Sequence, residues 1–200
     1  QSFQETNLSL ERLSDIVDHP EEIEIAGEQL PPMPPIEGAI SYSGVSFRFA
    51  SQGPLQVLNV GFEIPPGEFV GIVGSSGSGK STMVTLVPRL YDATNGAVLV
   101  DGHDVRDLTG DSLHDAIGVV SQDPHLFHES IESNLRYAKP DATTEEIVAA
   151  CEAARIQDTI DALPDGLATL VGERGYRLSG GEKQRLAIAR MLLKDPAIMI

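Results

Sequence analysis

The chain has 200 residues, of which 41% are hydrophobic and 22% are charged, a composition typical of a globular domain. Its formal net charge of −16 argues against a nucleic-acid partner, because phosphate backbones are bound by clustered Lys and Arg. No apolar run reaches about 18 residues, so we expect no membrane-spanning helix in these residues. The single cysteine, Cys151, cannot form an internal disulfide and is expected to lie in the core.

The N-terminal 37 residues divide into a predicted helix and a linker. Residues 1–18 carry Leu, Ile and Val at near-helical spacing with charged residues between them, and His19-Pro20 ends this pattern. Residues 20–37 are first acidic and then proline-rich, which indicates a stiff, extended linker. Because the sequence begins with Gln1 rather than Met, we expect it to be a segment of a longer protein.

From residue 38 the pattern becomes that of a folded α/β domain. Alternating apolar residues predict strands over 40–49 and 55–64, and Pro65-Pro66-Gly67 predicts a turn. The apolar run over 68–73 is typical of a buried strand, and a helix is expected from residue 80 to about 90. Further strands are predicted over 97–100, 117–120 and 197–200.

The second half of the chain is predicted to be mainly helical. Residues 129–163 have a helical pattern, and Thr143 with Glu146 has the spacing of a capping box that opens a helix through Arg155. Residues 164–166 form a Pro-Asp-Gly turn. A last helix is expected over 180–193, ended by Asp195-Pro196.

Residues 74–81, with the sequence GSSGSGKS, match the phosphate-binding pattern G-x-x-x-x-G-K-[S/T] in full. Glycines let backbone N–H groups turn toward one phosphate chain, and the helix that follows points its positive end at the same anion. Lys80 would then reach the β- and γ-phosphates, and the Ser81 hydroxyl would bind Mg²⁺. The alternative, a merely flexible Gly/Ser loop, does not explain its position between an expected strand and helix.

A second motif, LSGGEKQR at residues 178–185, opens the last predicted helix. Ser179 and Glu182 have capping-box spacing, so a purely local role is one interpretation. Gly180 and Gly181 weaken the first helical turn, which makes more sense if a ligand must approach the backbone closely. A second anion site at this helix end is therefore the other interpretation.

The two motifs together resemble the nucleotide-binding domain of ABC ATPases, from about residue 40 to 200. The resemblance implies an α/β fold with a P-loop NTPase core, an antiparallel β subdomain and a helical subdomain over about 129–170. It also implies ATP and Mg²⁺ as ligands, and a second nucleotide-binding domain that packs head-to-tail. The signature residues expected to bind ATP held by that second domain are Ser179, Gly180, Gly181 and Glu182.

The resemblance carries over to further positions. Gln122 matches the glutamine that contacts Mg²⁺ or the attacking water, so with Lys80 it is a candidate catalytic residue; a plain surface-loop Gln is the alternative. Phe49 stands where the family places an aromatic ring on adenine, although a core Phe at a strand end would look alike. The expected ATP-binding residues are Phe49, Gly74, Ser75, Ser76, Gly77, Ser78, Gly79, Lys80, Ser81 and Thr82, with Ser81 and Gln122 toward the metal.

Two segments resemble ABC exporters in particular. Residues 169–175, TLVGERG, match a segment that lies near the membrane domain in exporters. Residues 1–19 resemble the extension of the last membrane helix, followed by the linker over 20–37 and the nucleotide-binding domain over 38–200. The resemblance therefore implies an ATPase that powers export, at the cytoplasmic face of a membrane, with a membrane domain in the same parent chain.

In the family, an Asp and a Glu follow the strand matched by residues 197–200, so we expect the 200 residues alone to hydrolyse ATP weakly or not at all. Two other functions stay open at this point. One is a soluble ABC-type ATPase acting on nucleic acid or the ribosome, against which the charge and the short insert between Lys80 and Ser179 weigh. The other is a nucleotide-binding fragment without turnover.

Overall fold

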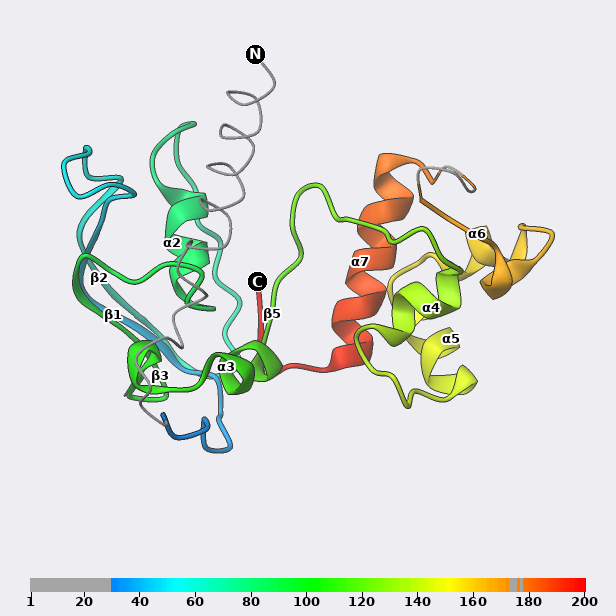
Figure 1. Cartoon of the computed structure of the whole chain (residues 1–200), viewed down its shortest axis with the longest axis horizontal. Coiled ribbons are helices and arrows are strands. Elements are labelled where there is room, and N and C mark those ends of the chain that lie inside the picture. Colours follow the sequence, from blue (N-terminus) through cyan, green and yellow to red (C-terminus); the bar gives the residue numbers. More distant parts are fainter. Residues whose placement is uncertain (1–29, 173–175, 177) are drawn as a thin grey trace, which may run out of the picture.

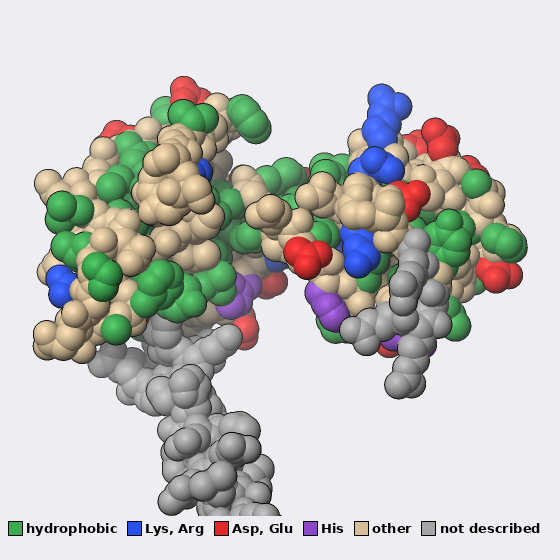
Figure 2. Space-filling model, turned by 90° about the horizontal axis from the view of Figure 1, so that it is seen from above, with side chains coloured by type: hydrophobic (Ala, Val, Ile, Leu, Met, Phe, Trp, Pro, Cys, Tyr) green, Lys and Arg blue, Asp and Glu red, His purple; other side chains and the backbone are tan. Residues whose placement is uncertain are grey.

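The computed structural model describes residues 30–172, 176 and 178–200, which form two lobes (Figure 1). One lobe holds a sheet with short helices against it, and the other is helical. Seen from above, the lobes are joined by a narrower middle region (Figure 2). The helix predicted over 1–18 and the first part of the linker lie outside the described residues.

The first lobe is built on a four-stranded antiparallel sheet with the order β2-β1-β3-β4. Its strands are β1 (Ile40–Phe47), β2 (Val57–Ile64), β3 (Asn95–Val100) and β4 (His103–Asp104). The antiparallel β subdomain and three of its strands are thereby confirmed, whereas the short β4 was not predicted. Alternate side chains such as Tyr42 and Val98 are buried, as expected for a sheet with one covered face.

Helix α2 (Lys80–Leu86) covers this sheet and positions the phosphate loop that precedes it. Leu86 and Val87 join the sheet core, and the hydroxyl of Tyr42 in β1 donates a 2.6 Å hydrogen bond to the carbonyl of Met83. The helix ends earlier than predicted; turns follow, in which Arg89 has a φ of 56°, outside the helical region. The 3₁₀ helix η2 (Val105–Asp107) and α3 (Gly110–Ala116) complete the lobe.

The second lobe confirms the predicted helical subdomain. It comprises α4 (Ile131–Arg136), α5 (Thr144–Ala153), α6 (Gln157–Asp161), the 3₁₀ turn η3 (Gly166–Ala168) and α7 (Gly180–Lys194). Their apolar faces share one core, in which Cys151 is fully buried and free, as expected. Helix α5 opens with the predicted capping box of Thr143 and Glu146.

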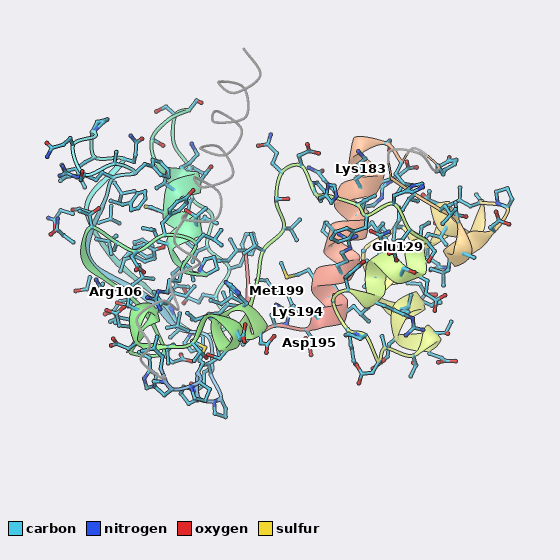
Figure 3. All side chains as sticks on the ribbon, viewed as in Figure 1. Arg106, Glu129, Lys183, Lys194, Asp195 and Met199 are labelled. Atoms are coloured by element: carbon cyan, nitrogen blue, oxygen red, sulfur yellow. The ribbon has the colours of Figure 1, made fainter. Side chains whose placement is uncertain are left out.

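A short parallel sheet joins the lobes. Strand β5 (Ile117–Gly118) pairs with β6 (Ile198–Met199), with Ile117 opposite Ile198. The chain reaches β6 from the end of α7 by way of Lys194 and Asp195, which are labelled with Met199 in Figure 3. A methyl group on Gly118 would lie 2.1 Å from the Met191 sulfur of α7 and 2.8 Å from Cγ of Pro196, so a larger residue here would force these side chains to shift.

The strand predicted over residues 68–73 is wrong for this structure. This segment has no regular structure, and Phe69 and Val73 are 100% and 92% exposed. An extended backbone becomes a strand only when a neighbour pairs with its N–H and C=O groups, and within the described residues no strand pairs with 68–73. The described parallel part of the core is therefore limited to β5 and β6, which are also shorter than predicted.

Candidate functional site

The phosphate loop leads directly into α2, as the motif predicts. Gly77 and Gly79 have φ angles of 78° and 87°, a region that favours glycine. A methyl group on Gly79 would lie 2.5 Å from the carbonyl oxygen of Gln56, just before β2. A glycine is therefore required at position 79 both by its backbone conformation and by the close approach of the Gln56 backbone.

Lys80 folds its ammonium group back into this loop. The Nζ atom donates to the carbonyls of Gly74 at 2.9 Å and Ser75 at 2.7 Å, and lies 3.5 Å from the Ser78 hydroxyl. The loop thus closes around a positive charge, and no carboxylate forms an ion pair with Lys80 within the described residues. Phosphate oxygens can replace the carbonyls around this cation, because both are hydrogen-bond acceptors and phosphate adds charge.

Phe49 follows β1 and lies in an aromatic cluster with Phe47 and Tyr91. Its ring centroid is 4.9 Å from that of Phe47 and 5.2 Å from that of Tyr91, both nearly perpendicular. Phe49 is 60% exposed, so it is not a core side chain, unlike Phe47. The cluster is connected to the phosphate loop through Gln56. Its N–H donates to the Phe47 carbonyl, and its carbonyl oxygen lies where a side chain on Gly79 would have to go.

The second motif caps helix α7. The Ser179 N–H donates to the Glu182 carboxylate at 2.6 Å, and the Glu182 N–H donates to the Ser179 hydroxyl at 3.4 Å. The hydrogen bond from the Ser179 backbone lowers the pKa of Glu182 below its ordinary value. Gly180 has open space around it, and a methyl group on Gly181 would meet only the end of the Arg185 side chain. The local capping interpretation is confirmed, and the glycines leave the backbone accessible beside the cap.

Gln122 is an exposed residue in the segment between β5 and α4, and it lies beside α7 rather than beside the phosphate loop. Its carbonyl accepts a 3.2 Å hydrogen bond from the Gln184 side chain. Within the described residues no hydrogen bond joins Gln122 to Lys80 or Ser81, and none joins the second motif to the phosphate loop. The structure therefore places the predicted site residues in two lobes, with the phosphate loop in one and the second motif in the other (Figure 1).

The exporter-like segment begins at Thr169 and is bonded to the chain that follows Gln122. The Val171 N–H donates to the Glu129 carbonyl at 2.9 Å, and the Ile131 N–H donates to the Thr169 carbonyl at 3.0 Å. Residues 173–175 of this segment lie outside the described residues.

Two polar residues of the helical lobe, one buried and one half-buried, were missed by the sequence analysis. Asn134 is fully buried in α4, and Arg190 of α7 reaches it with its guanidinium group. A signal was present, because each of the two lies between apolar residues. Asn134 lies between the core residues Ile131 and Leu135, and Arg190 lies between the core residues Ala189 and Met191. A polar side chain on such an apolar face needs a specific hydrogen-bond partner.

The family model for ABC transporters matches residues 57–200, which includes both motifs. The chain belongs to the ABC transporter family. It is 45% identical over 194 residues to Heavy metal tolerance factor 1 of Caenorhabditis elegans, covering 97% of this chain and 24% of that protein. It is 41% identical over 198 residues to the cyclolysin secretion/processing ATP-binding protein CyaB of Bordetella pertussis, covering 99% of this chain and 27% of that protein.

The fold is shared with a solved structure, a bacterial Atm1-family ABC exporter with ATP bound, at a TM-score of 0.88 and 37% identity. That match covers 98% of this chain and 34% of the exporter chain. The ABC ATPase fold is thereby confirmed, and the chain spans about a quarter of the length of the curated relatives that it matches.

No helix among the described residues is both long and apolar enough to cross a bilayer. The same residues also contain no cluster of three or more His, Cys, Asp or Glu side chains suited to holding a metal ion.

Proposed function

We propose that this chain is the ATP-binding domain of an ABC exporter. The observation that carries the proposal is the phosphate loop, in which the Lys80 ammonium group is held by main-chain carbonyls that phosphate oxygens can replace. The ATP-binding residues are those of the loop over 74–82, with the adenine ring placed on the exposed face of Phe49. Membership of the ABC transporter family supports ATP as the nucleotide.

Mg²⁺ would be held by Ser81 and by phosphate oxygens of ATP, with Gln122 as the second protein ligand. Ser81 fits this role because it lies exposed in the first turn of α2, directly after Lys80. Mg²⁺ uses oxygen ligands and keeps several waters, so few protein groups are needed. When bound, Mg²⁺ neutralises charge on the β- and γ-phosphates. Gln122 has to approach the phosphate loop, since in this structure it contacts α7 instead.

The second motif is proposed to complete the ATP site of another nucleotide-binding domain. Its separation from the phosphate loop of the same chain supports this arrangement, because a single copy leaves each half open. Gly180 and Gly181 allow the γ-phosphate to approach the backbone at the start of α7, and the Ser179 hydroxyl can still donate one hydrogen bond. Closure of two copies over two ATP molecules would then bury both nucleotides.

In the whole protein, ATP binding and hydrolysis are proposed to drive export through a membrane domain, with this chain at the cytoplasmic face. The names of the relatives support export but differ in cargo, one referring to heavy metals and one to cyclolysin. Both relatives are similar to almost the whole of this chain although their names refer to different cargoes. We therefore propose that the substrate is selected by residues outside this chain. The alternative is a soluble ABC-type ATPase acting on nucleic acid or the ribosome, and membrane spans in the parent gene would decide against it.

Turnover by the 200 residues alone is proposed to be weak. Strand β6 is followed here by Ile200, so the two acids that the family places after this strand are not among these residues. Without them, a water-positioning group and one metal partner are missing from phosphoryl transfer.

Substitution of Lys80 by Met tests ATP binding by this chain. Isothermal titration with Mg·ATP should show saturable binding by the natural chain and a loss of at least about 100-fold in affinity for K80M, because a charge-assisted contact to phosphate is removed. Arg155→Met is the control, since Arg155 is an exposed cation in the helical lobe. Equal affinities for the natural chain and K80M, or no binding by the natural chain, would contradict the proposal.

A further inference from the structure

Asn134 fixes the chain that follows Gln122 by imitating a peptide group. Its side-chain oxygen accepts the Phe127 N–H at 3.0 Å, and its side-chain nitrogen donates to the Phe127 carbonyl at 3.0 Å. The same nitrogen donates to the Ser130 carbonyl at 2.9 Å. Because Asn134 is fully buried, losing these bonds would leave unpaired polar groups in the core.

Arg190 joins this amide to helix α7. Its Nε atom donates to the Asn134 carbonyl at 2.8 Å, one terminal nitrogen donates to the His125 carbonyl at 2.8 Å, and the other donates to the Asn134 side-chain oxygen. Arg190 forms no ion pair with a carboxylate of the described residues. A half-buried guanidinium that is bonded to oxygens of a loop and of α4 fixes their geometry rather than neutralising an acid.

The same segment carries the exporter-like residues. Ser130 forms an antiparallel bridge with Leu170, flanked by the main-chain bonds from Val171 to Glu129 and from Ile131 to Thr169. Figure 3 shows Glu129 on this segment, beside the helices of the helical lobe. Arg190 and Asn134 therefore connect α7, the residues after Gln122 and the segment from Thr169.

The part of this segment around Gln122 is open, whereas Pro124 and Leu126 further along it are buried. A cavity of about 260 Å³ lies between Ser121, Pro124 and His125 on one side and Ala187 and Met191 of α7 on the other. Gln122 is exposed, and its contact to Gln184 is a single long hydrogen bond. The bond from Arg190 to His125 is thus the principal polar tie between this segment and α7.

We infer that Arg190, acting through Asn134 and the His125 carbonyl, is a positioning residue that makes residues 121–131 and the helix of the second motif move as one body. This inference rests on the proposed function, because Arg190 would fix the position of Gln122 relative to the second motif when ATP is bound. It adds Arg190 and Asn134 to the residues on which the geometry of the proposed ATP site depends.

Hydrogen–deuterium exchange of the 200-residue chain tests the connection without nucleotide. In Arg190→Met we expect the amides of Phe127, Ile131 and Val171 to exchange about tenfold faster. The reason is that Arg190 no longer holds Asn134 and the His125 carbonyl, so the segment that carries these amides or their acceptors opens more often. Exchange in α5 should be unchanged, and Arg190→Lys should recover part of the protection, since one ammonium can reach one carbonyl. Arg155→Met, which removes a cation from the same lobe, is the matched control.

A second measurement separates positioning from simple stabilisation. For each variant, the affinity for ATP is measured with and without Mg²⁺, and the ratio of the two affinities is compared. Arg190→Met should lower this ratio to the value found for Gln122→Ala. Gln122→Ala itself should leave the hydrogen exchange of the Phe127 amide unaltered. If Arg190→Met unfolds, the same comparison is made with Arg190→Lys. Unchanged exchange at these amides, or an equal rise throughout the chain, would overturn the inference. Failure of the natural chain to bind ATP would overturn the proposed function instead, while the exchange result would still stand.

Discussion

At the scale of single residues, the phosphate loop shows how two glycines can differ in what they require. Gly77 and Gly79 both have left-handed backbone angles. Around Gly77 a methyl group would meet nothing within 4 Å, whereas at Gly79 it would meet the Gln56 carbonyl at 2.5 Å. Substitution by alanine therefore strains the backbone at both positions, but it causes a steric clash only at Gly79.

This difference predicts the stabilities of two alanine variants. Gly77→Ala should lower the free energy of unfolding by about 1 kcal/mol, the ordinary cost of a left-handed residue with a side chain. Gly79→Ala should lower it by at least about 2 kcal/mol, because the Gln56 backbone or the start of α2 must also move. Urea unfolding followed by circular dichroism measures both, and equal midpoints would contradict the geometry of the loop.

At the scale of elements, the sequence predicted best those features that depend on neighbours along the chain. Both capping boxes are present, and strands β1 and β2 lie close to their predicted ranges. The strand over 68–73 failed because pairing depends on a distant partner, which a local apolar pattern cannot supply. Asn134 and Arg190 stand among apolar residues in the sequence, but the sequence does not give their hydrogen-bond partners, because these are set by tertiary contacts.

The cap of α7 predicts a pH dependence of stability. The folded-state pKa of Glu182 lies below its ordinary value of 4.5, because the Ser179 N–H favours the carboxylate. The stabilisation is therefore complete above the unfolded pKa and is lost as the pH falls through the lower folded value. Since Glu182 is largely solvated, we expect the free energy of unfolding to fall by only about 0.5 kcal/mol between pH 5 and pH 3. The fall is measured as a lower midpoint of urea unfolding.

Glu182→Gln provides the comparison for this prediction, because a glutamine oxygen can still accept the Ser179 N–H but does not titrate in this range. The variant should retain α7 and lose part of the acid dependence, while the similar box of Thr143 and Glu146 in α5 continues to titrate. An acid dependence identical to that of the natural chain would show that the Glu182 cap does not contribute.

At the scale of the whole molecule, the two halves of the proposed ATP site lie in different lobes. The phosphate loop and Phe49 belong to the sheet lobe, and the second motif opens α7 in the helical lobe (Figure 1). The lobes are connected by the short β5–β6 pair and by the segment that Arg190 holds to α7. This arrangement favours a site shared between two copies, in which each copy supplies one half.

Mixing two variants tests this central claim most directly. Lys80→Met disables the phosphate loop, and Gly180→Asp places a carboxylate where the γ-phosphate should approach, at a position with open space for it. We predict by sedimentation velocity that neither variant dimerises with ATP, whereas an equimolar mixture does, because one of its two sites is complete. A mixture that stays monomeric while the natural chain dimerises, or a Gly180→Asp chain that dimerises alone as well as the natural chain, would contradict the account.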